Sequence, residues 1–555
     1  MYETLFALTT IFAVAAALLL VAARFDLPVI PFYLLAGALS GVVIDEAQLF
    51  DLAQWGIAFI VFLFGVHVDL ESVAARERPG VAVGVVQAVL VGSLGYLVAT
   101  IIGLGPLDAV YFAVAAGLSS SLVAASYLDE RDGVRPTHRR LSEAIHFTED
   151  LLGVAVVVVL GAFVYADIAA PVQLAVGGGI LLGGLLVRYL LFHRLTALVR
   201  DDPEVLMMLG FSLVIGFIAL AEAAGLSIVV GAFAAGVAVA DDYPHSLALV
   251  DTLHDLRDFF APVFFVTLGA LVAVPTVATV GYTAALLFGV LVVNPLVVTL
   301  LALRVGYDGR TAVYTAAALD HVSAFSLFIA IEAIDAGLIA RPLFDAIVWT
   351  AGISMVVSAY GVARAPTIHR LLRRSGLVDL VGTATNGRTS VPDDLSDHVI
   401  VVDHRHGGDT VLNACADSDR DLVVVEDDPT VIDAVTERCD GYVYGDLRDD
   451  RVWERANLAD AGLLVSLAPE VDRAEVVAEL DTDVPRVVRA DDEALADRLL
   501  DAGVDTVVAP ETLAADRLTR NFDAVLAGDL PPDALGNVER EERRDEREER
   551  RDEPE

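Results

Sequence analysis

The sequence predicts a multi-pass α-helical membrane domain followed by an α/β domain with a doubly wound parallel sheet. Three observations lead to this prediction. Hydrophobic residues make up 56% of the 555 residues, and the mean hydropathy is +0.62. The apolar residues are concentrated in long stretches before residue 364. After residue 376, short Val-rich runs alternate with polar helical stretches, as they do in soluble α/β domains.

The apolar stretches are long enough to cross a membrane as helices, since a span needs about 20 apolar residues. The first is acidic at its start, so we expect a true span rather than a cleaved signal peptide. We count about thirteen, at residues 4–23, 27–44, 51–69, 80–104, 107–127, 141–165, 169–192, 204–224, 226–241, 255–274, 278–304, 311–335 and 341–363.

The arginines between these stretches predict the orientation. If the N-terminus is outside, every inner loop carries at least one arginine, whereas the outer loops carry only Arg341. Loops on the cytoplasmic side of a membrane are enriched in basic residues. We therefore expect a plasma-membrane protein with its N-terminus outside and its C-terminal domain in the cytoplasm.

The chain is strongly acidic. It has 77 acidic residues and 37 basic ones, all of them arginine, and a formal net charge of −40. This charge excludes a nucleic-acid partner, which would require a basic surface. Adaptation to a salty, haloarchaeal cytoplasm explains the charge, with compositional drift as the alternative. The two cysteines, Cys415 and Cys439, lack the spacing of a zinc site.

The count of spans also allows an inverted repeat. Two six-span halves offset by seven spans have opposite orientations, and such transporters bind substrate on broken helices near the midplane. Polar residues interrupt the fifth span and its partner, the twelfth. Serines also commonly bond to their own helix, so the serines alone leave both interpretations open. The interrupting residues are Ser119, Ser120 and Ser121 in the fifth span, and Asp320, His321 and Ser323 in the twelfth.

An acidic pair, Glu149 and Asp150, lies inside the sixth span. It is roughly 13 Å from the start of that span, near the bilayer centre. A carboxylate there costs about 3 kcal/mol or more, and such residues usually mark ion or proton pathways. The alternative is a carboxylate held by an arginine, but none is found at comparable depth. His146, one turn earlier, suits proton access, or is simply a packed side chain.

The chemistry of this pair suits cation and proton exchange. Carboxylate oxygens are suitable ligands for a hard monovalent cation, Na⁺ or K⁺. A site that holds either the cation or a proton, but not both, is sufficient for antiport. We therefore predict a secondary transporter rather than an enzyme, with Asp150 and Glu149 as its cation ligands.

Six segments, in this order and spacing, resemble the monovalent cation:proton antiporter-2 family, which contains the Kef-type potassium efflux systems. The resemblance implies antiport through a rocking or elevator-like core, a homodimer, and Asp150 as the essential carboxylate. The segments are Pro31–Gly37, Leu63–Val66, Gly117–Ser121, Thr148–Asp150, Gly231–Gly236 and Phe259–Gly269.

The chain departs from the family pattern at three places. Glu149 replaces a glutamine or aspartate, and the resemblance implies that this position sets ion choice. Asn294 stands where the family often has a lysine or arginine, which favours electroneutral exchange. The segment Ser323–Phe325 lacks the family's glutamate, while Asp320 and His321 lie nearby. The choice between Na⁺ and K⁺ and the stoichiometry stay open.

The C-terminal domain resembles the RCK-type (regulator of K⁺ conductance) nucleotide-binding domain that often follows these antiporters. The resemblance is strongest over Tyr444–Leu467. Strands alternating with helices predict a Rossmann-like parallel sheet. The expected strands are Val399–Val402, Leu422–Glu426, residues 442–446, Leu463–Ser466, Arg486–Arg489 and Thr506–Val508.

The glycine motif of a dinucleotide site is degenerate in this domain. At Asp403–Gly408 only the last of three glycines remains, and Asp403 would repel a pyrophosphate unless Arg405 offset it. We expect no cofactor to be required for transport and NAD(H) or an adenine nucleotide as a regulator. A nucleoside without a full pyrophosphate, or a scaffold that only dimerises, are the alternatives. The candidate contacts are Gly408, Arg405, Glu426 and Asp446.

We expect four regions: a transmembrane domain (1–375), a linker (376–397), an RCK-type domain (398–530) and a charged, disordered tail (531–555). Two other functions remain possible at this stage. A ligand-gated potassium efflux channel could use the same scaffold. A membrane-anchored oxidoreductase is the remote alternative, because the chain lacks a substrate domain and an intact glycine motif.

Overall fold

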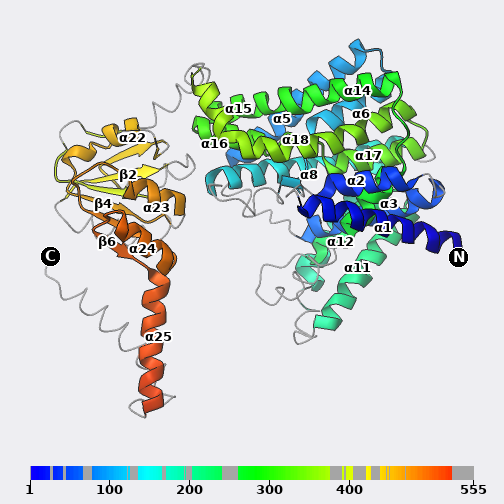
Figure 1. The fold of residues 1–555 in the computed structure, drawn as a ribbon. Helices are drawn as coiled ribbons and strands as arrows, with labels where there is room; N and C mark the ends of the chain where they lie inside the picture. The colour runs from blue at the N-terminus through cyan, green and yellow to red at the C-terminus, as the bar shows by residue number, and fades with distance from the viewer. Residues whose placement is uncertain are drawn as a thin grey trace. The chain divides into compact units, whose positions relative to one another are not determined.

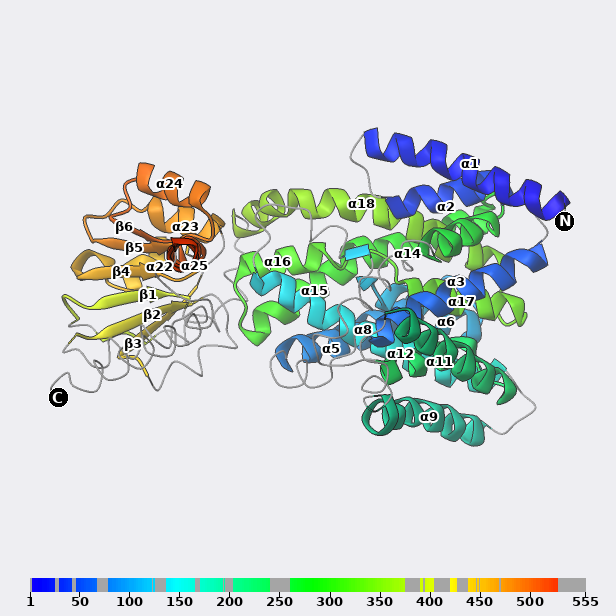
Figure 2. The ribbon, with the colours of Figure 1, turned by 90° about the horizontal axis from the view of Figure 1, so that it is seen from below.

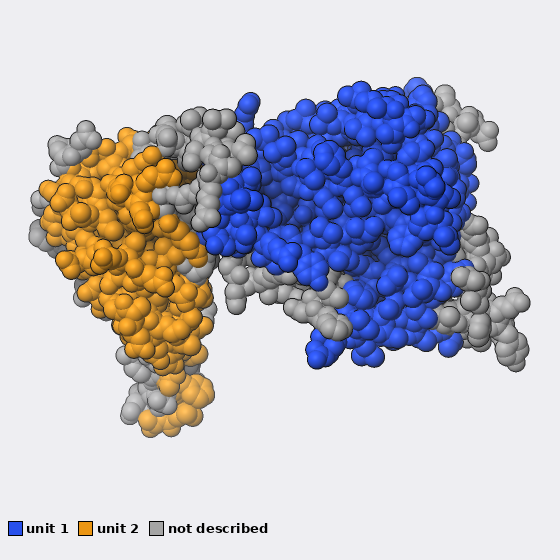
Figure 3. Space-filling view, turned by 45° about the horizontal axis from the view of Figure 1, so that its top comes forward, with its two compact units in different colours: residues 1–384 blue, residues 385–555 orange. Residues whose placement is uncertain are grey.

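The chain folds into two compact units, residues 1–384 and 385–555 (Figure 3). In the computed structural model, the described residues are 2–24, 29–41, 46–66, 78–121, 123–124, 136–164, 170–192, 194, 203–239, 260–374, 390–392, 395–403, 420–426, 438–445, 447–448, 450–468 and 471–527.

The first unit is built entirely of helices in its described part (Figure 1). Each predicted span coincides with a helix or with a broken helix. The helices are α1 (Tyr2–Arg24), α2 (Val29–Ser40), α3 (Glu46–Val66), α5 (Arg78–Ile101), α6 (Pro106–Gly117), α8 (Pro136–Val164), α9 (Ala170–Val187), η2 (Arg188–Phe192), α11 (Pro203–Ala223), α12 (Ile228–Val239), Phe260–Ala270, α14 (Val277–Phe288), η4 (Gly289–Val293), α15 (Asn294–Val305), α16 (Gly309–Ala317), α17 (Ala324–Asp335) and α18 (Arg341–Arg374).

Four helices of the described part are long and apolar enough to cross a membrane by themselves. They cover Arg78–Ile101, Pro171–Leu191, Val277–Val305 and Arg341–Leu372, and shorter apolar helices accompany them. The structure therefore agrees with a multi-pass helical domain, whereas the count of thirteen spans stays a prediction. The last helix, α18, continues to Arg374, eleven residues beyond the expected end of the final span.

The helices pack in two groups. The first group comprises α3, α11 and α12 together with α1 and α2, which the helix Phe260–Ala270 joins to α3; α2 also packs on α18 of the second group, which comprises α5, α6, α8 and α14 to α18. Helix α9 packs on α8 and α12, and therefore contacts both groups. Figure 2 shows α1 and α9 on opposite sides of this unit.

Glycines allow the helices of the first group to cross at close range. A Cβ atom at Gly37 on α2 would overlap the carbonyl oxygen of Val266, and one at Gly269 would overlap that of Leu34. Gly236 on α12 faces α3 in the same way. Small residues permit such close backbone contact, which drives helix association in membranes. Three of the family-like segments therefore have a packing role.

The second unit contains a six-stranded parallel sheet with the order β3-β2-β1-β4-β5-β6. Alternate residues of β1 and β2 contribute to separate apolar clusters on the two faces, which explains their uninterrupted Val-rich sequences. Helix α25 projects away from the sheet (Figure 1). The elements are β1 (Val399–Val402), β2 (Leu422–Glu426), β3 (Gly441–Tyr444), α22 (Asp450–Arg455), η6 (Leu458–Asp460), β4 (Leu463–Ser466), α23 (Val471–Ala478), β5 (Arg486–Arg489), α24 (Glu493–Asp501), β6 (Thr506–Val508) and α25 (Pro510–Ala527).

Candidate functional site

Two broken helices meet in the second helix group. Helix α6 ends at Gly117 and is followed by extended chain, and α16 and α17 are separated by residues 318–323. The backbone N–H of Ser323 donates to the carbonyl oxygen of Leu118 at 3.0 Å. Nε2 of His321 donates to the carbonyl oxygen of Ser120 at 2.9 Å. The structure thus brings together the two polar interruptions that the sequence placed seven spans apart.

The acidic pair on α8 faces the first break. Glu149 is 1% exposed and Asp150 is 3% exposed. Oε2 of Glu149 accepts hydrogen bonds from both the backbone N–H and the hydroxyl of Ser119. The hydroxyl of Ser121 donates to Oδ2 of Asp150 at 2.5 Å. The break therefore supplies three hydrogen bonds to two neighbouring carboxylates.

No arginine of the described residues forms an ion pair with either carboxylate. Oε1 of Glu149 also has no hydrogen-bond partner in that part of the chain. A carboxylate held structurally by an arginine, the alternative considered above, is therefore not what these residues form. Buried oxygen atoms without protein donors are suited to a cation or to a proton.

The second break contains an acidic residue, Asp320, whose side chain faces α18. Asp320 is 7% exposed, and a Cβ atom at Gly361 would lie 2.9 Å from its Oδ2. The hydroxyl of Ser323 caps α17 by accepting from the backbone N–H of Phe325 at 3.1 Å. Ser323 thus has a local structural role, while Asp320 lies within the break and, among the described residues, forms no hydrogen bond to Glu149 or Asp150.

Gln87 on α5 is a site residue that the sequence analysis missed. Its Nε2 donates to the carbonyl oxygen of Gly117 at 3.2 Å and to Oδ1 of Asn294 at 2.6 Å. Nδ2 of Asn294 donates in turn to the carbonyl oxygen of Leu319 at 2.7 Å. This buried amide pair supplies hydrogen bonds to a free carbonyl group at each break.

A π-helical turn positions Asn294. The segment η4 (Gly289–Val293) ends directly before Asn294, and the backbone N–H of Asn294 donates to the carbonyl oxygen of Gly289. Pro295 follows and has no N–H to donate, which accounts for the irregular turn at this point. Asn294, one of the predicted site residues, lies between the two breaks.

His146 lies near the acidic pair but contacts the second break. Its ring centroid is 6.1 Å from that of His321, and its Nδ1 bonds to the carbonyl oxygen of Ser142 at 2.8 Å. Nε2 of His146 has no hydrogen-bond partner in the described part of the chain. The ring is 2% exposed, which agrees with a packed side chain as well as with a step on a proton path.

Aromatic rings fill the space between the helix groups beside the acidic pair. The ring of Phe64 on α3 lies 6.0 Å from Phe147 on α8, 5.8 Å from Phe233 on α12 and 6.0 Å from Phe325 on α17. Phe147 is two residues from Glu149. These rings form an apolar cluster beside the acidic pair.

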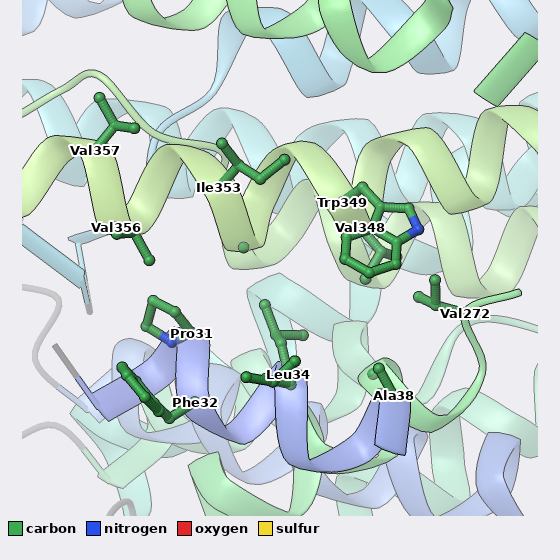
Figure 4. Close-up of a pocket in the computed structure, with 13 residues that line it drawn as sticks. Pro31, Phe32, Leu34, Ala38, Val272, Val348, Trp349, Ile353, Val356 and Val357 are labelled. Carbon is green, nitrogen blue, oxygen red and sulfur yellow. The ribbon is translucent and has the colours of Figure 1, made fainter. Parts of the chain in front are cut away.

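A separate cavity of about 330 Å³ lies between α2 and α18 (Figure 4). Pro31 and Leu34 on α2 face Val348, Trp349 and Ile353 on α18. Apart from the ring nitrogen of Trp349, these side chains are apolar. The side chains that line the cavity therefore supply no oxygen ligand, which makes it a poor site for a cation.

In the second unit, Glu426 is the last residue of β2 and is 2% exposed. The other three predicted nucleotide contacts, Arg405, Gly408 and Asp446, lie outside the described residues. Asp403 forms a buried ion pair with Arg473, in which Nη1 of Arg473 is 3.0 Å from Oδ2 of Asp403. The sequence suggests Arg405 as the cation that offsets this charge and gives no local sign of Arg473, which is distant in the chain.

Comparison with known proteins gives two family matches. Residues 9–365 match the family described as "Sodium/hydrogen exchanger, transmembrane", and residues 399–510 match the "TrkA-N domain". The glutathione-regulated potassium-efflux system protein KefC of Cronobacter sakazakii is 27% identical over 510 residues, covering 88% of this chain and 80% of the relative. KefC of Escherichia coli (strain K12) is 24% identical over 509 residues with the same coverage.

Solved structures match the two units separately. The sodium proton antiporter MjNhaP1 from Methanocaldococcus jannaschii is 16% identical with a TM-score of 0.45, covering 66% of this chain and 99% of that one. The TrkA-N domain of the inner membrane protein YbaL from Escherichia coli is 24% identical with a TM-score of 0.22, covering 23% of this chain and 97% of that one.

Proposed function

The chain belongs to the sodium/hydrogen exchanger family, with a TrkA-N domain after its membrane domain, and we propose that it exchanges Na⁺ or K⁺ for protons across the cell membrane. The relatives KefC are named as potassium-efflux systems, and MjNhaP1 as a sodium proton antiporter. They support cation and proton exchange as the reaction and leave the choice of cation to experiment.

One observation carries the proposal: two adjacent carboxylates are buried where two broken helices cross. Asp150 binds either the cation or a proton, so that the arrival of one requires the departure of the other. Glu149 and the hydroxyls of Ser119 and Ser121 supply further oxygen atoms to the cation. Glu149 influences which cation is preferred, and Ser120, Asp320, His321 and Ser323 form the polar surroundings of the crossing.

The remaining parts of the proposal concern the cell. The protein acts as a homodimer in the plasma membrane, with its N-terminus outside and its second unit in the cytoplasm as a regulator. The excess of acidic residues and the lack of lysine support a salty, haloarchaeal cytoplasm. The predicted inner loops carry nearly all of the loop arginines, whereas the outer loops carry only Arg341, and this asymmetry supports the orientation.

The test uses membrane vesicles that contain a pH-sensitive dye. Addition of Na⁺, K⁺ or Li⁺ should move protons in vesicles with the wild-type protein and not in those with Asp150→Asn. Asp335→Asn is the matched control, because Asp335 lies exposed at the end of α17. Undiminished exchange by Asp150→Asn would refute the role of Asp150. Cation flux without proton movement in the wild type would indicate a channel instead.

A further inference from the structure

The apolar cavity between α2 and α18 lies where the two helix groups meet, because α2 belongs to the first group and α18 to the second. Its volume of about 330 Å³ is within the range of about 300–1,000 Å³ that is usual for ligand pockets. Protein interiors are otherwise close-packed, so a space of this size at a helix contact suggests an occupant.

The cavity reaches the surface of the membrane domain. Three of the residues that line it are partly exposed: Leu35 on α2 is 41% exposed, and Ile353 and Val357 on α18 are 39% and 40% exposed. Helix α18 is one of the helices long and apolar enough to cross a membrane. Exposed apolar side chains on such a helix face the hydrocarbon chains of lipids, and these chains therefore have access to the cavity.

One polar atom in the cavity lacks a partner. Nε1 of Trp349 is buried and has no hydrogen-bond partner among the described residues. Figure 4 shows this nitrogen on the side of the ring toward Val272, which lines the same cavity. An indole N–H usually finds an acceptor when it is buried, and each exception requires an explanation. The unpaired donor therefore indicates an occupant that carries an oxygen atom at this end of the cavity.

The position of the donor gives the occupant a direction. Trp349 is the lining residue of α18 closest to Arg341 except for Val348, and Val357 is the furthest. At about 1.5 Å per residue, the part of the helix between Trp349 and Val357 is about 12 Å long. The oxygen-bearing end thus lies toward the start of α18 at Arg341, and the apolar remainder lies toward the middle of the helix. A membrane lipid has this polarity.

We propose that the cavity binds one hydrocarbon chain of a membrane glycerolipid, and that the indole N–H of Trp349 donates to an oxygen atom of the glycerol linkage. The bound chain lies between α2 and α18 and contacts both helix groups. The inference does not depend on the ion that the protein transports, and its test measures binding rather than transport.

Gly352 allows the cavity to be filled without disturbing the backbone. A Cβ atom at this position would lie 3.6 Å from Cδ1 of Leu34, which is an ordinary contact. Leucine also favours a helix more than glycine does, so Gly352→Leu should fold. Gly281→Leu on α14 is the matched control, because a Cβ atom there would have nothing within 4 Å and Gly281 does not line the cavity.

The first experiment titrates the purified full-length protein in detergent with dioleoyl-phosphatidylglycerol and counts bound lipid by native mass spectrometry. The wild type and Gly281→Leu should each bind one lipid per chain saturably. Gly352→Leu should bind it at least about tenfold more weakly, because the leucine side chain occupies the space of the lipid chain. Equal binding by Gly352→Leu would show lipid around the surface only and overturn the proposal.

The same spectra test a second copy of the protein as the occupant. In that case the wild type would retain no lipid, and Gly352→Leu would dissociate into monomers. This result would overturn the proposal, whereas an oligomeric state that is the same in the wild type and in both leucine variants supports it.

The second experiment uses Trp349 as the reporter. The chain has three tryptophans, so Trp55→Phe/Trp453→Phe leaves Trp349 as the only one. A glycerolipid with bromine atoms on its chains should quench its fluorescence saturably in detergent micelles. The control retains only Trp55, which is 45% exposed on α3, and should be quenched in proportion to the brominated lipid in the micelle. Proportional quenching of Trp349 as well would overturn the proposal.

Competition in this assay tests the oxygen atom. Methyl palmitate carries an ester, whereas hexadecane has a similar chain and no oxygen. Methyl palmitate should displace the brominated lipid from Trp349 at least about fivefold more effectively, which is the effect expected of one hydrogen bond. Equal displacement by the two compounds would contradict the bond to the indole N–H.

Discussion

The hydroxyl of Ser121 donates a hydrogen bond of 2.5 Å to Oδ2 of Asp150, and it thereby joins the first helix break to the proposed cation carboxylate. Ser121 is the first residue after the extended segment, so its side chain position depends on where α6 ends. The geometry of the break therefore controls the environment of Asp150 directly.

Ser121→Ala should lower the apparent affinity for the transported cation by about tenfold. A hydrogen bond to a charged group contributes about 1.5–3 kcal/mol, and 1.4 kcal/mol corresponds to a factor of ten. The cation concentration for half-maximal proton movement in vesicles measures the effect. Ser40→Ala is the control, because among the described residues the hydroxyl of Ser40 on α2 bonds only to the carbonyl oxygen of Ala36 in its own helix. Equal half-saturation in all three proteins would contradict the prediction.

Glu149→Gln should retain exchange through Asp150 and change the preference between Na⁺ and K⁺. An amide oxygen attracts the smaller, more strongly hydrated Na⁺ less than a carboxylate oxygen does. We expect the ratio of the two apparent affinities to shift toward K⁺ by about tenfold. The same vesicle assay with each cation in turn measures it. A preserved ratio would show that Glu149 does not select the ion.

Gln87→Leu and Asn294→Leu should each destabilise the first unit. Each leaves buried carbonyl groups without a donor, which costs about 1–3 kcal/mol. Thermal unfolding in detergent should show lower midpoints for both variants. The loss of stability in the double variant should be smaller than the sum of the two single losses, because the two side chains bond to each other. Gln54→Leu on α3 serves as the control. Strict additivity would indicate two independent packing effects.

Exchange of the cation for protons should be electroneutral, since a neutral amide pair, Gln87 and Asn294, occupies the place where the family often has a cation. The initial rate in vesicles should be the same with the membrane potential held at zero and at about 100 mV. A cycle that moved one net charge would respond to about 2.3 kcal/mol at that potential. A rate that changed severalfold would show that charge moves and would refute this prediction.

Cys439 should react slowly with thiol reagents. Burial, assisted by the neighbouring Asp440, raises the pKa of its thiol to about 11, so roughly one thiol in a thousand is ionised at pH 8. The alkylation rate should rise about tenfold per pH unit up to pH 10. A Cys415→Ser background isolates the signal of Cys439. A rate that levels off near pH 9 would indicate an ordinary thiol.

Much of the architecture could be predicted from local sequence. The uninterrupted Val-rich run at Val399–Val402 marks a strand buried on both faces, and the structure confirms it. Likewise, the polar residues between Gly117 and Ser121 disrupt an apolar stretch, and the helix ends there. In both cases the signal lies within a few neighbouring residues, so no knowledge of tertiary contacts is needed.

The partners across the fold could not be predicted in this way. Gln87 is a single amide within an apolar helix. Its role depends on a tertiary hydrogen bond to Asn294, which lies 207 residues later in the chain. Arg473 lies on an amphipathic helix and resembles a surface arginine until the sheet brings it to Asp403. Both residues depend on long-range packing, which the pattern along one segment does not contain.

The bond between the N–H of Ser323 and the carbonyl of Leu118 has a consequence for sequence divergence. It uses only main-chain atoms, so any residue except proline at position 323 can form it. This one bond of the junction therefore persists when side chains around the crossing are exchanged during evolution. A lineage adapting to a different cation or salt regime can thus alter its ligands one mutation at a time.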